Sequence, residues 1–126
     1  MPEMMKWIIF PVLAFPALGL AEAESEFNLC SSYVEKSEVG APSDLGWPVF
    51  VKLTEVSTTS LAAFKEANTG KEIRIVVGRR EFSRATVWVP VPSGNLHGMF
   101  NSQEVATDWQ QTLASELPAA PCGARN

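Results

Sequence analysis

The chain has 126 residues, of which 10 are Lys or Arg and 14 are Asp or Glu, and its formal net charge is −4 at pH 7. A mildly acidic protein with a pI near 5.0 gains nothing from the field of a polyanion, which argues against generic nucleic-acid binding. The length suffices for one domain with a modest core and is too short for two.

Residues 1–23 have the three parts of a secretory signal peptide. Lys6 supplies a positive charge, Trp7–Leu20 is an apolar run, and Ala21-Glu22-Ala23 offers the small residues that a signal peptidase accepts. The alternative is an uncleaved membrane anchor, but at 1.5 Å per residue the run reaches only about 21 Å of the roughly 30 Å hydrocarbon core. We therefore expect cleavage after Ala23 and a periplasmic or secreted protein. No later apolar run approaches about 18 residues, so we expect no stable membrane span after cleavage.

Cys30 and Cys122 lie near opposite ends of the expected mature chain. Because exported proteins meet an oxidising environment, the pair predicts one disulfide. Closing a loop of about 90 residues would stabilise the fold by about 4 kcal/mol. The alternatives are a lipidated Cys30, for which Leu29 is an unfavourable preceding residue, and a free catalytic thiol, for which His97 is the sole histidine available as a base.

Residues 24–46 are polar and contain a loop sequence at Gly40–Asp44. Phe27, Leu29 and Tyr33 in this segment fit a strand or an irregular helix, and both remain open. We interpret 24–46 as an N-terminal extension held down by Cys30.

A strand is predicted over Val49–Leu53, where valines and a leucine alternate with Phe50, Lys52 and Thr54. The hydroxyls of Ser57–Thr59 are candidate N-caps for a helix that runs to about Asn68. Leu61 and Phe64 would form the buried stripe of that helix, and Gly70 would follow as its terminator.

Three more strands are predicted before the last helix. Ile73–Val77 alternates apolar and polar residues, Gly78-Arg79-Arg80 indicates a tight turn, and a third strand follows over Arg84–Val91. In that strand Ala85, Val87, Val89 and Val91 would share one face and Thr86 and Trp88 the other. A short fourth strand is expected over Leu96–Phe100.

The last helix has the clearest start signals in the chain. Asn101 and Glu104 are spaced as a capping box, and Phe100 and Val105 are placed as a hydrophobic staple. Val105, Trp109 and Leu113 would form a core-facing stripe, and Pro118 follows its end.

The order β-α-β-β-β-α predicts an α+β fold. We expect a two-layer sandwich of about four mostly antiparallel strands with two helices on one face. This core domain would occupy residues 47–117, followed by a C-terminal tail over 118–126.

Residues 49–121 resemble the head subdomain of the first periplasmic domain of SecD, the accessory subunit of the bacterial protein-export channel. The residues that carry the resemblance are Val49–Leu53, Phe64, Asn68–Lys71, Ile73–Val77, Ser93-Gly94, Leu96, Met99–Ala106 and Leu113–Pro121. The SecD head is thought to capture an emerging polypeptide, while membrane helices couple its movement to the proton gradient. The resemblance therefore implies a fold and a binding habit. It implies no proton-driven motor, and no catalytic or ligand residue of SecD falls within the matched region.

Few residues in the chain could support catalysis or metal binding. His97 has no predictable carboxylate or thiolate partner, which favours a structural role over a catalytic one. One histidine and two bridged cysteines cannot supply the ligands of a zinc site. No phosphate-binding loop or nucleophile elbow is present, so we expect no cofactor, no metal and no enzymatic activity.

The candidate interaction surface consists of Trp88, Phe50 and the arginines near the predicted hairpin, with Trp47 as a possible addition. Arg79, Arg80 and Arg84, together with Arg74, could form an anion-binding patch, or they could be a solvated strand edge that resists aggregation, which we favour. Trp88 would lie on the open sheet face and contact a protein partner, unless the 24–46 extension covers it.

These observations favour a non-catalytic periplasmic binding module that contacts polypeptide or an envelope protein. The alternatives are a small secreted enzyme that uses His97 or a carboxylate, and an inhibitor or immunity-type protein on the same scaffold.

Overall fold

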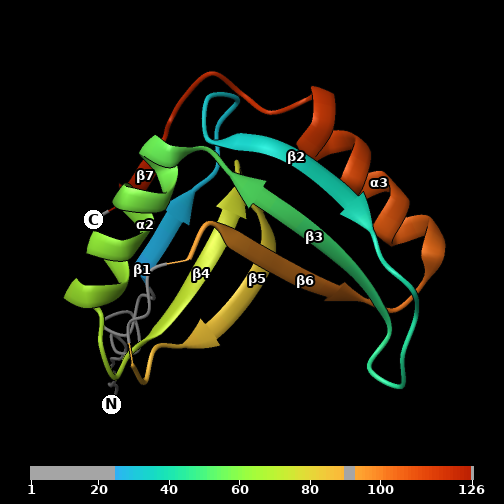
Figure 1. Cartoon of the computed structure of the whole chain (residues 1–126), viewed down its shortest axis with the longest axis horizontal. Coiled ribbons are helices and arrows are strands. Elements are labelled where there is room, and N and C mark those ends of the chain that lie inside the picture. The colour runs from blue at the N-terminus through green and yellow to red at the C-terminus, as the bar shows by residue number, and fades with distance from the viewer. Residues whose placement is uncertain (1–24, 90–92, 126) are drawn as a thin grey trace, which may run out of the picture.

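The computed structural model describes residues 25–89 and 93–125, so the predicted signal peptide and the end of the predicted strand Arg84–Val91 lie outside the described residues. The described elements, labelled in Figure 1, are β1 (Ser25–Asn28), β2 (Val34–Val39), β3 (Trp47–Leu53), α2 (Glu55–Ala67), β4 (Glu72–Val77), β5 (Arg80–Thr86), β6 (Asn95–Phe100), α3 (Gln103–Ser115) and β7 (Gly123–Arg125).

The strands form two sheets. Sheet A has the order β5-β4-β1-β7 and sheet B the order β2-β3-β6. All neighbouring strands are antiparallel except β1 and β4, which are parallel. The α+β class is confirmed, but the described strands number seven in two sheets instead of about four in one.

The sequence predicts two helices on one face of the sheet, but in the structure the two helices do not share a face. Helix α3 packs against the three strands of sheet B, whereas α2 packs against β7 and β3. Figure 1 shows them on opposite flanks of the molecule. The predicted single helical layer is therefore wrong, because α3 packs across sheet B, whereas α2 packs on β7 of sheet A and on the neighbouring strand β3 of sheet B.

The segments that flank the predicted 47–117 domain are built into the sheets. Residues 24–46 supply β1 and β2, and residues 118–126 supply β7. Strand β1 lies between β4 and β7, and Phe27 and Leu29 are fully buried. In the structure, the expected extension therefore contributes strands and core residues to the same fold as residues 47–117.

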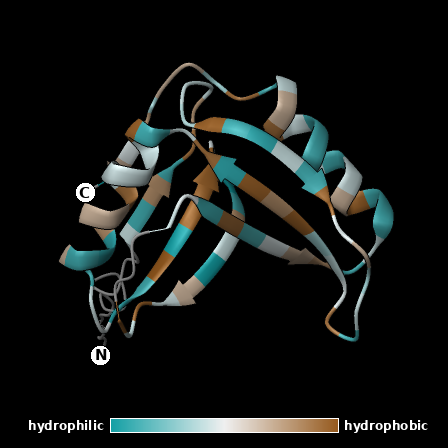
Figure 2. Ribbon diagram, viewed as in Figure 1, coloured by the Kyte–Doolittle hydropathy of each residue, from teal (hydrophilic) through white to brown (hydrophobic). Residues whose placement is uncertain are grey.

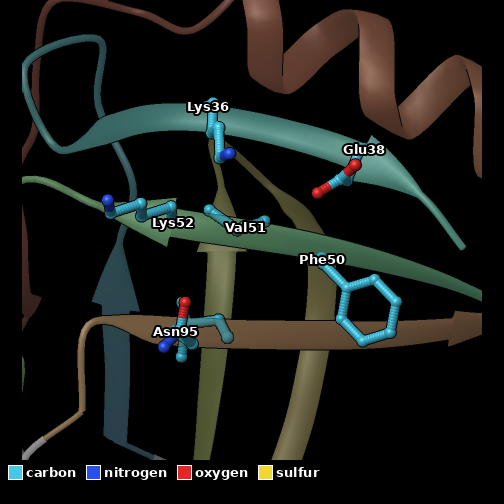
Figure 3. Close-up of a pocket in the computed structure, with 7 residues that line it drawn as sticks. Lys36, Glu38, Phe50, Val51, Lys52 and Asn95 are labelled. Carbon is cyan, nitrogen blue, oxygen red and sulfur yellow. The ribbon is translucent and has the colours of Figure 1, made fainter.

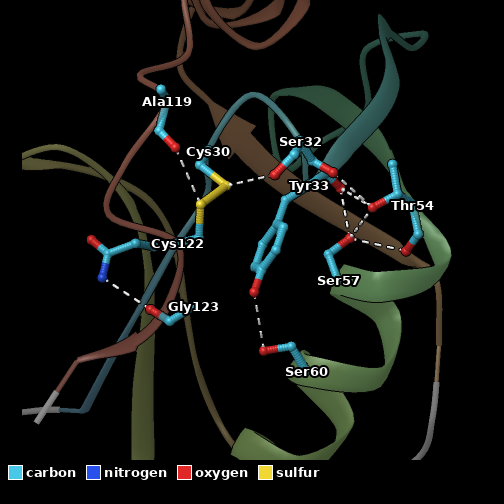
Figure 4. Close-up of a disulfide and its surroundings, with 10 residues drawn as sticks. Cys30, Ser32, Tyr33, Thr54, Ser57, Ser60, Ala119, Cys122 and Gly123 are labelled. Carbon is cyan, nitrogen blue, oxygen red and sulfur yellow. Dashed lines mark hydrogen bonds between the residues drawn. A yellow bond between two sulfur atoms is a disulfide. The ribbon is translucent and has the colours of Figure 1, made fainter.

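The disulfide Cys30–Cys122 is formed, as predicted, with a Cα–Cα distance of 5.2 Å. Backbone and side-chain hydrogen bonds join the same two chain ends: Ser31 N donates to Pro118 O at 2.9 Å, and Asn28 Nδ2 donates to Gly123 O at 3.0 Å. Figure 4 shows the disulfide beside Tyr33, whose hydroxyl donates to Ser60 Oγ of α2 at 3.4 Å. These contacts hold the C-terminal strand against β1 and α2.

Helix α2 begins earlier than expected. Its N-cap is Thr54, so the three candidate caps Ser57–Thr59 lie inside the helix, and Ser57 is buried in the first turn. The Ser57 hydroxyl donates to the Tyr33 carbonyl oxygen at 2.6 Å and thereby ties α2 to the chain after β1 (Figure 4). Leu61 and Phe64 are buried as predicted.

Strand β5 differs most from its prediction. The turn at Gly78-Arg79 is tight, with Gly78 at φ 62°, and pairing resumes at once with Val77 opposite Arg80. The turn sets the register between β4 and β5. Because β4 begins at Glu72, the paired part of β5 ends at the residue opposite it, Thr86. Of the expected valine face, Val87 is buried, whereas Ala85 is exposed and Val89 is 74% exposed.

Helix α3 matches its predicted position but not its predicted cap. Ser102 is the N-cap, and its hydroxyl accepts a hydrogen bond from Val105 N, so the Asn101–Glu104 capping box is wrong. Val105 is 45% exposed and does not face the core. Trp109 and Leu113 are buried as predicted, accompanied by Ala106 and Thr112.

An aromatic cluster joins the two sheets. The ring centroids of Phe82 on β5 and Phe100 on β6 are 5.8 Å apart, and both lie within 6 Å of Trp109 on α3. A Cβ on Gly98 would come within 2.7 Å of the Phe82 carbonyl oxygen, so only glycine allows this approach of β6 to β5. Hydrophilic and hydrophobic residues alternate over the first part of β4 (Figure 2), where Ile73 and Ile75 are buried and Glu72 and Arg74 point to the other side, and the strand ends in buried valines.

Candidate functional site

Sheet B has one face covered by α3 and one face that no described helix covers. Val49, Val51 and Leu53 point to the covered side and are buried. Phe50 and Lys52 alternate with them and therefore point to the opposite side. We call that side the outer face, and its members are Lys36, Glu38, Phe50, Lys52, Asn95 and His97.

The outer face consists of two cross-strand rows. Lys36, Lys52 and Asn95 are directly opposite one another on β2, β3 and β6 and form the lysine row. The second row, which we call the phenylalanine row, consists of Glu38, Phe50 and His97. On each strand it is two residues away from the lysine row. Directly opposite residues have their Cβ atoms about 5 Å apart, so each row is a set of neighbouring side chains.

A hollow of about 480 Å³ lies on this face, bordered by Lys36, Glu38, Phe50, Lys52 and Asn95 together with Val51 and Leu96 (Figure 3). Phe50 is 46% exposed, and its ring centroid lies 6.3 Å from that of His97. A Cβ on Gly40 would come within 2.4 Å of the Phe50 ring, so glycine at this position lets the ring lie close against the end of β2.

The outer face continues toward sheet A across β6. A second hollow of about 350 Å³ is lined by Glu81–Arg84 of β5 and His97–Met99 of β6.

In the described part of the chain, β5 and β6 are the terminal strands of their sheets and share no ladder. The other two terminal strands are covered: α2 packs on β7, and Gln110 of α3 donates to Ser37 O of β2 at 3.3 Å. Covering an edge in this way protects it from pairing with other chains.

Arg74 and Arg84 lie in a row of ion pairs on the outer side of sheet A. Arg74 pairs with Glu26 and, at 2.8 Å, with Glu81. Arg84 pairs with Glu81 at 2.8 Å and with Glu72 at 3.1 Å. The Arg84 guanidinium, supported by Arg74, holds the pKa of Glu81 below its usual value, although partial burial opposes the shift. These arginines are compensated by carboxylates and do not form an open anion site.

Arg80 is directed to the other side of the hairpin. Its guanidinium donates to Asp108 at 3.1 Å and lies 4.1 Å from the centroid of the Trp109 ring. Arg79 is exposed in the turn before β5. The arginines that we expected to form one patch are therefore distributed over the turn, the α3 contact and the outer side of sheet A.

Trp88 is 75% exposed, but it does not lie on a sheet face. It follows the end of β5, next to Val87, whose backbone bonds to Gly70 and Lys71 of the turn between α2 and β4. Trp88 lies at one end of β5 and Arg79 and Arg80 at the other, about 20 Å away. Phe50 is on β3, which belongs to the other sheet. The structure does not bring the candidate surface residues together.

Several residues of the outer face were not singled out from the sequence. Lys36, Glu38 and Asn95 become neighbours of Phe50 through strand pairing, and β2 was not predicted as a strand. The signal that could have found Lys52 is the alternation along β3, which places it on the same side as Phe50.

In residues 25–89 and 93–125, no group of three or more His, Cys, Asp or Glu side chains could hold a metal ion. His97 is exposed, and Phe50 is its aromatic neighbour. Over the same residues, no helix is long and apolar enough to cross a membrane.

Neither a protein-family model nor a curated protein matches the sequence. Among solved structures, the fold is similar to SecDF, a membrane component that enhances protein export, with a TM-score of 0.60 and 14% sequence identity. The match covers 75% of this chain and 43% of that chain. A likeness at this identity shows the fold alone, and it confirms the expected SecD-like fold.

Proposed function

We propose that this protein is a non-catalytic module of the cell envelope that binds polypeptide, or an exposed segment of an envelope protein, through its outer face. The observation that carries the proposal is Phe50, a half-exposed aromatic side chain at the centre of an uncovered sheet face and at the rim of a hollow. Aromatic side chains surrounded by polar neighbours are typical centres of protein contact sites.

The shape and chemistry of the face support a polypeptide ligand over a small molecule. The hollow opens onto a sheet surface, and its border mixes an aromatic ring, aliphatic stems, charges and an amide. A small-molecule site is usually a deeper and more apolar cavity. The SecD-like fold adds a second line of support, since SecDF enhances protein export.

A periplasmic or secreted location belongs to the same proposal. It is supported by the signal-peptide pattern of residues 1–23 and by the disulfide, because disulfides persist mainly in oxidising compartments. A non-catalytic role is supported by the bridging of both cysteines and by the ring neighbour of His97, which is neither an acid nor a base.

The proposal is tested by measuring how tightly a fluorescently labelled, permanently unfolded polypeptide binds to the wild-type protein and to Phe50→Thr. Threonine removes the ring but keeps the strand preference of this position. We expect the substitution to weaken binding by about 1–3 kcal/mol, as loss of a central aromatic contact does, while the melting temperature changes little because Phe50 is half-exposed.

Trp88→Thr is the matched control, since Trp88 is the other strongly exposed aromatic side chain of the described residues. We expect it to bind like the wild type. If Trp88→Thr weakens binding and Phe50→Thr does not, the contact site lies at the end of β5 and the outer face is not the site. If wild-type protein does not bind the polypeptide, the proposed function is wrong.

A further inference from the structure

Resting on the proposed function, we infer that the outer face selects extended segments in which an apolar side chain and a carboxylate are two residues apart. The apolar side chain would lie on Phe50, and the carboxylate would lie between Lys36 and Lys52. The ligand class is thus an acidic–apolar polypeptide segment in extended conformation.

The first observation is a like-charge pair in the sheet. Lys36 and Lys52 are directly opposite one another on β2 and β3, and both are exposed on the outer face. Like charges at directly opposite positions destabilise a sheet. A local arrangement that costs stability is expected where it serves a function. Here the ammonium groups of Lys36 and Lys52 border the hollow, where they could bind a carboxylate of a ligand.

The second observation is that the pair is only partly compensated. Lys52 forms an ion pair with Glu35 at 3.5 Å, and both side chains are about half exposed. Lys36 forms no ion pair with another residue in the described ranges 25–89 and 93–125. The lysine row therefore retains positive charge that a ligand can neutralise, and Asn95 completes the row with an amide that can donate to the same carboxylate.

Glu38 defines where the carboxylate can bind. It lies opposite Phe50 in the phenylalanine row, so a carboxylate placed over Phe50 would be repelled. A carboxylate over the lysine row avoids this repulsion and meets both ammonium groups. The charges on the face therefore favour one register of a bound segment.

The spacing of the two rows fixes the sequence pattern. They are separated by two residues along β3, which corresponds to about 6.8 Å. In an extended peptide, side chains two residues apart lie on the same side at the same spacing. A segment that runs along β3 can thus place an apolar residue on Phe50 and the carboxylate two positions away on the lysine row.

The test uses labelled synthetic peptides in a Ser/Thr background that contain one Phe and, two residues away, Glu, Gln or Lys. A fourth peptide has Glu directly adjacent to Phe, where it points to the other side. We expect the Phe-x-Glu peptide to bind about two- to fivefold more tightly than the Gln peptide, the size of an exposed ion pair, and the preference to disappear at high salt. The Lys and adjacent-Glu peptides should bind no better than the Gln peptide.

Lys36→Glu provides the sharpest variant. It should abolish the preference for the Phe-x-Glu peptide and create one for the Phe-x-Lys peptide. It should also raise the melting temperature, because Lys52 would then face an opposite charge across the sheet. Lys71→Glu makes the same charge change at an exposed position between α2 and β4, and it should alter neither peptide preference.

Equal binding of the Glu, Gln and Lys peptides by wild-type protein would overturn this inference while the proposed function stands. Failure of all peptides and of the unfolded polypeptide to bind would overturn both. If Lys36→Glu leaves the peptide preference unchanged but eliminates binding to vesicles of anionic phospholipid, the lysine row serves a membrane surface and the peptide assignment is wrong.

Discussion

Glu81 shows how ion pairing determines the role of the arginines on sheet A. Its carboxylate pairs with Arg74 on the neighbouring strand β4 and with Arg84 on its own strand β5, and the side chain is 33% exposed. An arginine engaged in this way holds the strands in register, and little of its charge remains for an external anion. On the outer face of sheet B, by contrast, Lys36 is exposed beside the Lys52–Glu35 ion pair and is open to a ligand.

This ion pairing predicts a pH-dependent contribution to stability. Since the pKa of Glu81 is lowered in the folded state, the carboxylate stabilises the fold above the unfolded pKa of about 4.3, and this contribution is lost as the pH falls through the folded pKa. Glu81→Gln should therefore lower the free energy of unfolding by about 0.5–1 kcal/mol at pH 7, a value reduced for its partial exposure. Urea unfolding at several pH values measures the difference, which should vanish near pH 2. A difference that is equally large at both pH values would contradict the assignment.

At the same scale, the sequence indicates some residues of the site and not others. The direction of Phe50 could be predicted because Val49, Val51 and Leu53 alternate with it along one strand. Lys36 could not, because its strand, β2, has a mostly polar sequence without a clear apolar face. Its position beside Lys52 depends on pairing between strands, which sequence periodicity does not report.

Among the elements, those with local signals were predicted and those that depend on distant partners were not. Helices α2 and α3 and strands β3 and β4 follow from periodicity, and β6 follows from the turn sequence before it. Strands β1 and β7 are short, and each is stabilised by neighbours far away in the sequence. The predicted strand Arg84–Val91 is shifted, because β5 pairs from Arg80 directly after the turn and ends at Thr86, opposite the first residue of β4.

Strand β7 and the disulfide give a prediction at the element scale. The Cys30–Cys122 bond closes a loop with a sequence separation of 92 and holds β7 beside β1. Replacing both cysteines by alanine should lower the free energy of unfolding by about 4 kcal/mol in the chain-entropy estimate. Denaturant unfolding of the wild type and the double variant measures this loss.

Hydrogen exchange supplies the control for the disulfide variant. Amide protons of β7 should lose protection first, because this strand is short and lies at the end of sheet A. A double variant with unchanged stability and unchanged protection of β7 would show that hydrogen bonds such as Asn28 to Gly123 hold the strand without the disulfide.

At the scale of the whole molecule, the covered and uncovered surfaces support the proposed position of the binding site. Helix α3 covers the inner face of sheet B and the edge of β2, and α2 packs on β7. The uncovered surface runs from the lysine row across Phe50 and His97 to the hollow between β6 and β5. Phe50 is the half-exposed aromatic side chain in the phenylalanine row of this surface.

The most direct test of the central claim is to map the binding of an unfolded polypeptide on the isotopically labelled protein by amide chemical shifts. The account predicts that the largest changes occur in β3 and β6, around Phe50, Lys52 and His97, and that the amides of Val87–Val89 stay unchanged. Changes confined to the end of β5 around Trp88, or no change in any amide at saturating polypeptide, would contradict it.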